Sequence, residues 1–359
     1  MITSILIDAT HIGTNQPTGV ERYVDALLPV LSEKLMAAGV DVTWVSHYDE
    51  PAHPAGVKWI RSEHVHGWGQ FAVRQLMLDG KFDLYFTPSS IVPLGGLFQR
   101  SMTMHDLSFM RFPKAYSPSQ RIRLGWWAPR AAVLSRTIIV PSEFVKNDLI
   151  RFWKVPTNKI EVAYHGPIPL SEKAVTVEGV NPEKPFIVYM GRLEEKKGLT
   201  PLILAFVELA KKNPDLQLVL AGKAGVGEDI VRRTVREMDS ATNNRIILPG
   251  YVSNEQQRWL YDHARVVAVP SPAEGFGFGV LEGFESSVPV VCSTEGAAPE
   301  IGGDAVLKAS NLPSWIGLLN QALEDEPTRS RLIAEGKKRL TQFSWDKSAQ
   351  ETAEALIRD

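Results

Sequence analysis

The chain is poor in the features that mark disulfide-bonded, nucleic-acid-binding and membrane-spanning proteins. Its 359 residues include one cysteine, Cys292, so no disulfide can form within the chain. Cys292 ends the apolar run 288–292, which indicates a buried side chain rather than a nucleophile. The formal net charge of -2 gives no overall attraction to nucleic acid. The apolar run 5–7 is cut by Asp8, and no run approaches the roughly 18 apolar residues of a membrane span, so we expect a cytoplasmic protein without such spans.

Sequence motifs for common cofactors and metals are also missing. There is no G-x-G-x-x-G and no G-x-x-x-x-G-K-[ST], so dinucleotide-binding and P-loop functions lose their main support. An Asp-x-Asp pair is absent, and His64 and His66 lie in a loop without an obvious third metal ligand. We therefore expect no cofactor and no metal. A bound diphosphate would be held by Arg, Lys and helix amides instead.

What the chain does contain is a repeated alternation of strand and helix patterns. With 44% apolar residues over a length that exceeds a single hydrophobic core, two domains are the natural expectation. Alternating β and α patterns predict parallel sheets covered by helices, as in Rossmann-like domains. The short β-branched runs are 4–7, 42–45, 84–86, 101–104 and 137–140 in the first half, and 186–189, 216–220, 245–248, 266–269 and 288–291 in the second.

The domain limits follow from breaks in this alternation. We expect a first domain over 1–168, a linker over 169–184 that ends in a Pro- and Lys-containing stretch, and a second domain over 185–343. Ser344 can cap a last helix over 344–359, which carries an apolar stripe long enough to pack across a domain junction.

The segment 271–282 is the most informative in the chain, because it places two carboxylates around a Gly-rich turn that follows an apolar strand. Glycines at 275, 277 and 279 let backbone amides approach an anion closely. A helix is expected to start near Gly279, and its amino-terminal end suits a diphosphate. Glu282, expected in the first turn, can accept hydrogen bonds from a ribose diol, while Glu274 lies on the loop. The alternative is an ordinary strand-to-helix turn with one solvated Glu.

Other polar residues also follow predicted strands. Arg192 and Lys197 come after the first strand of the second domain, where they can neutralise a leaving diphosphate, although such cations are usually solvated. In the first domain, Thr18 can cap a helix and Gly19 can let the backbone reach a ligand. His105 closes the strand 101–104 and can hydrogen-bond a sugar, or be a satisfied polar group.

Together these segments resemble the retaining glycosyltransferases of family 4, and especially their bacterial mannosyltransferase-like members. The resemblance implies a GT-B fold, in which two Rossmann-like domains face a central cleft and a C-terminal helix crosses back to the first domain. It covers nearly the whole chain, through Thr18-Gly19, 105–107, 141–144, Gly191-Arg192 to Lys197-Gly198, 250–252, 270–282, Pro299-Glu300 and 343–345.

The same resemblance implies roles for individual residues. Glu282 would hold the donor ribose, and Arg192 with Lys197 the diphosphate, while Gly191 would be a further donor-binding residue. Tyr251 and Val252 would lie along the base, His105 near the sugar C6 hydroxyl, and Thr18 with Gly19 near the phosphates. The remaining donor contacts would come from Glu274, Gly275, Phe276, Gly277, Phe278, Val280 and Leu281, with His105, Arg192, Lys197 and Glu274 as the catalytic set. Transfer with retention is then expected without metal.

Two segments depart from the family pattern. Where the family often has Ala-Cys-Gly before Val-Pro-Val-Val, this chain has Glu285-Ser-Ser287, which could alter helix packing. The customary Asn-Gly at the linker is His165-Gly166, which could alter the hinge or access of the acceptor.

The acceptor and donor are less defined than the fold. The segment 107–142 has no acidic residue but contains six basic side chains and two tryptophans, so a peripheral contact through 111–136 with an anionic membrane, and a lipid-linked glycan acceptor, are expected. The alternative is a solvated basic face over core tryptophans.

GDP-mannose is the favoured donor, and UDP-glucose, UDP-N-acetylglucosamine and dTDP-rhamnose remain open. The expected context is synthesis of a surface polysaccharide or O-antigen. Three alternative functions remain: a sugar phosphorylase or a nucleotide-sugar epimerase, which share the two-domain layout, and a non-catalytic glycan- or nucleotide-binding module.

Overall fold

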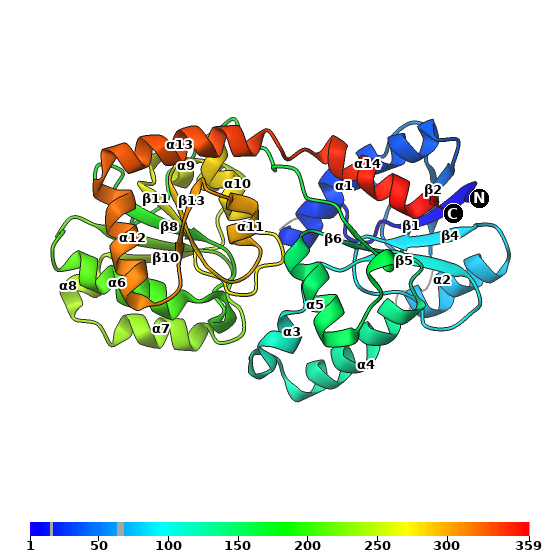
Figure 1. Cartoon of the computed structure of the whole chain (residues 1–359), viewed down its shortest axis with the longest axis horizontal. Helices are drawn as coiled ribbons and strands as arrows, with labels where there is room; N and C mark the ends of the chain where they lie inside the picture. The colour runs from blue at the N-terminus through cyan, green and yellow to red at the C-terminus, as the bar shows by residue number, and fades with distance from the viewer. Residues whose placement is uncertain (15–16, 63–67, 359) are drawn as a thin grey trace. The chain divides into compact units, whose positions relative to one another are not determined.

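The computed structural model describes residues 1–14, 17–62 and 68–358, so His64 and His66 lie outside it. It divides into two compact units (Figure 1). The first unit contains Met1–Met110, Pro118–Gly166 and Phe343–Asp359. The second contains Pro167–Gln342 and also the short segment Arg111–Ser117, which comes from the first half of the chain.

The first unit is built on a seven-stranded parallel sheet in the order β3-β2-β1-β4-β5-β6-β7. All five runs expected in this half form strands, but the two edge strands were not predicted. Edge strands are short and partly solvated, so they lack a continuous apolar run. The strands are β1 Ser4–Asp8, β2 Asp41–Ser46, β3 Lys58–Arg61, β4 Leu84–Thr87, β5 Gln99–Thr103, β6 Ile138–Val140 and β7 Ile160–Val162.

Helices pack on this sheet, and the last helix of the chain is among them. Ser344 caps α14 by accepting a hydrogen bond from Lys347 N at 3.1 Å. The stripe that includes Ala349, Ala353 and Leu356 is buried, and α14 lies along α1 (Figure 1). The chain therefore crosses back to its first unit, as predicted. The helices are α1 Gly19–Ala37, α2 Trp68–Leu78, α3 Ser108–Arg111, α4 Pro118–Leu134, α5 Glu143–Trp153 and α14 Trp345–Ile357.

The second unit repeats the arrangement with a six-stranded parallel sheet in the order β10-β9-β8-β11-β12-β13. Again only an edge strand, β13, was not predicted. The strands are β8 Phe186–Met190, β9 Gln217–Ala221, β10 Ile246–Gly250, β11 Val266–Val269, β12 Val290–Ser293 and β13 Val306–Ala309. The helices are α6 Leu199–Ala210, α7 Glu228–Arg236, α8 Ser240–Asn243, α9 Asn254–His263, α10 Phe278–Glu285, α11 Ala298–Gly302, α12 Leu312–Glu324 and α13 Glu326–Leu340, with a 3₁₀ turn η3 Glu195–Lys197.

Both sheets reverse their strand order beside their first strand. The reversal lies between β1 and β4 in the first unit and between β8 and β11 in the second. At such a reversal, the loops after two neighbouring strands run to opposite sides of the sheet and leave a crevice at the carboxyl ends of the strands. Open α/β sheets bind ligands in this crevice. The loops after β8 and β11 carry the residues that the sequence marked as a donor site.

The buried faces explain why the chain folds this way. Strands such as β9 and β11 are buried on both faces, as parallel strands between two helix layers must be. Cys292 lies on β12, is fully buried, and has a thiol pKa that burial raises to about 12. The expectation of an unreactive core cysteine is therefore confirmed.

One departure from the family pattern, Glu285-Ser-Ser287, includes a residue with an unusual backbone conformation. Ser287 has a φ of 58°, in the left-handed region, at the position where the family often has glycine. It follows the C-cap of α10, where Ser287 N donates to Phe284 O at 3.1 Å and Val288 N to Gly283 O at 2.9 Å. A side chain in this conformation costs about 1 kcal/mol.

We expect Ser287→Gly to stabilise the protein by about 0.5 kcal/mol, because relief of this strain exceeds the added entropy of the unfolded chain. The matched control is Ser286→Gly, since Ser286 has a φ of -81° and loses only entropy. Thermal unfolding should show a small rise for the first variant and a fall for the second. A fall for Ser287→Gly would mean that the serine makes a contact worth more than the strain.

Candidate functional site

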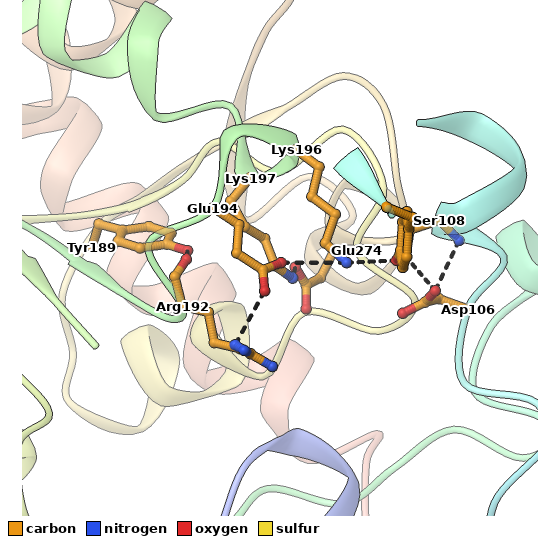
Figure 2. A network of polar contacts seen from close by, with 9 residues as sticks. Asp106, Ser108, Tyr189, Arg192, Glu194, Lys196, Lys197 and Glu274 are labelled. Atoms are coloured by element: carbon orange, nitrogen blue, oxygen red, sulfur yellow. Dashed lines mark hydrogen bonds and ion pairs between the residues drawn. The ribbon is translucent and has the colours of Figure 1, made fainter. Parts of the chain in front are cut away.

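The loop after β8 carries two cations that each meet a carboxylate. Arg192 Nε lies 3.1 Å from a carboxylate oxygen of Glu194, and Lys197 Nζ lies 2.8 Å from a carboxylate oxygen of Glu274 (Figure 2). Tyr189 Oη donates a hydrogen bond of 2.9 Å to the Arg192 carbonyl oxygen, which fixes the backbone at the start of the loop. The predicted pair of cations is thus ordered at the carboxyl end of the central strand.

The loop after β11 lies directly beside this one. A Cβ at Gly198 would overlap the carbonyl oxygen of Pro270, so the two loops touch backbone to backbone. Glu274 is held from its other side, because Ala297 N donates to the Glu274 carbonyl oxygen at 2.8 Å. The structure therefore brings Lys197 into contact with Glu274, with Arg192 on the same loop as Lys197 (Figure 2).

The Gly-rich turn starts α10 as expected, one residue earlier than the sequence suggested. Gly277 is the N-cap, with a φ of 97° that favours glycine. The first amides of a helix have no acceptor within the helix, so this turn can offer N–H groups and a positive dipole end to an anion. Val280 N is already used, since it donates to the Gly277 carbonyl oxygen at 2.9 Å.

Glu282 differs from its predicted setting. It is the fifth residue of α10 rather than a first-turn residue, and it is only 3% exposed. Tyr261 Oη, from α9, donates to the Glu282 carboxylate at 2.7 Å. The helix begins at Phe278 rather than Gly279, which places Glu282 in its second turn.

Four residues of this segment that were expected to contact the donor differ in how far their side chains are exposed. Val280 and Leu281 are core side chains with at most 1% exposure, so any ligand contact from them must come from the backbone. Phe276 is also buried, while Phe278 is half-buried, and their rings pack edge to face with centroids 5.2 Å apart. These residues hold the shape of the turn.

The residues expected along the base lie after β10. Tyr251 is 40% exposed, and Lys223 Nζ lies 4.9 Å from the centroid of its ring. Val252 is buried below the surface. An exposed ring backed by a cation and a buried aliphatic side chain offers a stacking face for a planar base.

The expected site residues of the first unit lie at the carboxyl ends of its strands. Thr18 is the N-cap of α1, as predicted, and its N–H donates to the Glu21 carboxylate at 2.8 Å, with its hydroxyl donating to the same group. A Cβ at Gly19 would meet no atom within 4 Å, so the backbone there is accessible. Glu21 already supplies an anion at this helix end, which a bound phosphate would have to accommodate.

His105 is half-buried, and its orientation is set by a backbone carbonyl. Its Nε2 lies 2.8 Å from the Pro88 carbonyl oxygen, which can only accept, so Nε2 carries the proton. Burial lowers the pKa of His105, which favours the neutral ring. Its Nδ1 is then a hydrogen-bond acceptor suited to a hydroxyl. Tyr23 packs edge-on against the ring, with centroids 4.8 Å apart.

The second departure from the family pattern is explained by packing. His165 stacks on Trp345, with ring centroids 5.6 Å apart and planes at 17°, and a Cβ at Gly166 would overlap Trp345. Burial lowers the pKa of His165 well below its usual range, so it is neutral near pH 7. The two stretches of chain that leave the first unit are thus packed against each other at this point.

Sequence reasoning missed several residues of the second-unit site: Glu194, Lys196, Lys223 and Tyr261. Glu194 and Lys196 stand between predicted ligands, so their charge was a usable signal. Tyr261 lies beside Trp259 and Leu260 in a largely polar helix, where it is expected to be a core residue and gives no such signal. Within residues 1–14, 17–62 and 68–358, no group of three potential metal-ligating side chains occurs, and no helix there is long and apolar enough to span a bilayer.

Comparison with known proteins agrees with this geometry. Residues 17–167 match the family described as Glycosyltransferase Family 4, and residues 171–339 match Glycosyl transferases group 1. The chain belongs to glycosyltransferase family 4. O-antigen chain mannosyltransferase B of Escherichia coli is 28% identical over 291 residues, which cover 77% of this chain and 74% of that protein. The expected likeness to bacterial mannosyltransferase-like members of the family is confirmed.

Solved structures show the same fold. WaaG, a glycosyltransferase involved in lipopolysaccharide biosynthesis, superposes with a TM-score of 0.71 at 13% identity, over 99% of this chain and 100% of that one. HepE from Anabaena in complex with UDP and glucose superposes with a TM-score of 0.69 at 18% identity, over 99% of each chain. The chain thus has the predicted GT-B fold, and its match to the two glycosyltransferase family models makes it a glycosyltransferase.

Proposed function

We propose that this family 4 enzyme transfers a hexose, with retention of anomeric configuration, from a nucleoside diphosphate sugar to a glycan hydroxyl. The observation that carries the proposal is the ion pair between Lys197 and Glu274, which joins the loop of Arg192 to the loop of the Gly277 turn at the point where the strand order reverses. Cations and helix amides converge there on one place, which is the chemistry that a sugar diphosphate requires.

The proposed reaction needs no nucleophilic side chain. The bond from the anomeric carbon to the β-phosphate oxygen breaks, and a bond from the acceptor oxygen to that carbon forms on the same face. The departing phosphate accepts the hydroxyl proton. Charge builds on the diphosphate as the sugar becomes cationic, so Arg192 and Lys197 stabilise the transition state more than the bound donor. No metal takes part in this scheme.

The donor proposed is GDP-mannose, and the context is synthesis of O-antigen or a related surface polysaccharide. The support is the similarity to the E. coli O-antigen mannosyltransferase. UDP-sugars are the main alternative, because HepE holds UDP and glucose on the same fold. The ring of Tyr251, with Lys223 beside it, would stack on either base.

The test is an assay of nucleotide release with GDP-mannose, UDP-glucose, UDP-N-acetylglucosamine and dTDP-rhamnose, with mannose-terminated oligosaccharides as probe acceptors and a chelator present. We expect release of one nucleoside diphosphate and a product whose anomeric configuration, read by NMR, equals that of the donor. Sugar phosphate formation that needs free phosphate would indicate a phosphorylase. Conversion of the donor without nucleotide release would indicate an epimerase, and binding without turnover a binding module.

The acceptor is proposed to be lipid-linked, because α4 presents an unusual surface. Ile122, Trp126 and Val133 are 73%, 51% and 69% exposed and share one face of this helix. Arg123 and Arg130 are exposed beside them, and Arg130 stacks on Trp126 at 4.3 Å. An apolar stripe flanked by arginines suits an anionic bilayer surface, where each arginine contributes about 1 kcal/mol.

We therefore expect Ile122→Ser/Trp126→Ser to weaken binding to vesicles of phosphatidylglycerol and phosphatidylethanolamine by at least about tenfold, since two exposed apolar side chains are lost. Phe71→Ser is the matched control, because Phe71 on α2 is 66% exposed in the same unit. Co-sedimentation at low salt measures both. Failure of the wild-type protein to bind these vesicles would remove the membrane proposal and leave the transferase proposal intact.

A further inference from the structure

Glu194 is a buried acid inside the loop that carries the proposed diphosphate ligands. Its side chain is 7% exposed, with one oxygen 3.1 Å from Arg192 Nε and the other 3.3 Å from Lys196 Nζ (Figure 2). A carboxylate is buried at low cost only when cations compensate it. The two ion pairs therefore hold Glu194 in place and fix both cations relative to the loop.

The neighbouring loop is shaped to accept this carboxylate. A Cβ at Gly225, after β9, would overlap the side chain of Glu194. Leu193 N donates to the Lys223 carbonyl oxygen at 2.9 Å, and Gly225 N donates to the Leu193 carbonyl oxygen at 3.2 Å. The position of Glu194 is thus set by backbone pairing between two loops and does not depend on a bound donor.

The atom that Glu194 contacts decides how Arg192 is presented. A guanidinium offers one edge that includes Nε and another formed by its two terminal nitrogens. Glu194 contacts Nε, so the terminal edge is directed away from the carboxylate. The Arg192 side chain is 53% exposed, and Tyr189 fixes the backbone carbonyl of the same residue. The arginine is therefore held from two sides with its terminal edge toward solvent.

We propose that Glu194 is a positioning residue for the donor diphosphate, acting through Arg192 without touching the substrate. The inference rests on the proposed function, since it requires a nucleoside diphosphate at Arg192. The negative charge of Glu194 also opposes diphosphate binding, because it lowers the positive electrostatic potential at Arg192. Burial and its two cation partners make Glu194 a fixed anchor, so the loss of order in a long arginine side chain outweighs the gain in potential.

The first test measures binding of GDP and of UDP to the full chain by calorimetry. Glu194→Gln keeps the shape and removes the charge, and we expect it to weaken binding of the preferred nucleotide by about tenfold. The matched control is Glu195→Gln, the same charge change on an adjacent exposed residue, with an expected change below about twofold. Equal or tighter binding by Glu194→Gln would overturn the proposal. A wild-type protein that binds neither nucleotide would instead overturn the proposed function.

A double-mutant cycle then separates positioning from a general structural effect. If Glu194 acts through Arg192, Glu194→Gln should cause no further loss once Arg192→Ala is present. A second tenfold loss in that background would contradict the proposal. Should Glu194→Gln unfold, Glu194→Asp serves in the same cycle, because it keeps the charge but shortens the reach to Arg192 Nε.

Discussion

Lys197→Ala is expected to lower kcat for sugar transfer by about 10²–10³-fold while changing KM for the donor far less. Negative charge grows on the leaving diphosphate in the transition state, and a preorganised cation there contributes about 3 to 4 kcal/mol. The loss is enlarged because Glu274, 2.8 Å from Lys197 Nζ, keeps its charge beside the leaving group.

The matched control for this prediction lies on the surface of the same unit. Lys211 pairs with Glu208 at 2.6 Å, and both side chains are exposed, so Lys211→Ala removes a lysine and an ion pair without approaching the site. We expect its kcat to equal that of the wild type, since exposed pairs contribute little. Steady-state kinetics of nucleotide release measure both variants. A kcat for Lys197→Ala within about threefold of wild type would place Lys197 away from the leaving group.

Glu282→Gln is expected to weaken nucleotide binding by about 10- to 100-fold. A hydrogen bond to an ionised carboxylate contributes about 1.5 to 3 kcal/mol, and the proposed ribose contact would lose that charge assistance. The charge of Glu282 and its orientation can be tested separately, because Tyr261 Oη donates to the same carboxylate at 2.7 Å. Tyr261→Phe keeps the charge and removes only this orienting bond, so we expect a loss of about threefold.

Thermal-shift titrations with GDP, UDP and dTDP, without added metal, measure this prediction, because a ligand that binds only the folded state raises the melting temperature. Glu324→Gln, an exposed residue of α12, controls for the change in net charge. Unchanged affinity in Glu282→Gln, together with a lower melting temperature, would mean that Glu282 only stabilises the fold through Tyr261.

Most of the fold could be predicted because local and tertiary requirements agree along this chain. Central parallel strands such as β9 and β11 are apolar on both faces, so they are visible as continuous runs. Thr18 and Ser344 were predicted as helix caps and are the N-caps of α1 and α14. The edge strands β3, β7 and β13 were missed, because a half-solvated edge has no such pattern.

Site residues could be predicted from the sequence only where they directly follow a predicted strand. Arg192, Lys197 and Glu274 were expected at the carboxyl ends of β8 and β11, and the structure brings them there. The burial of Glu282 was not predicted, because it depends on tertiary contacts such as the one with Tyr261 of α9.

The sequence by itself determined the two α/β domains, the Gly-rich turn and the residue types that meet a diphosphate, because periodicity and turn chemistry are local properties of the chain. Only the tertiary structure decided which charges pair. Lys197 and Glu274 are 77 residues apart, and they meet because the sheet order places β11 beside β8. That order depends on how helices and strands far apart in the sequence bury their apolar faces together, so no local segment specifies it.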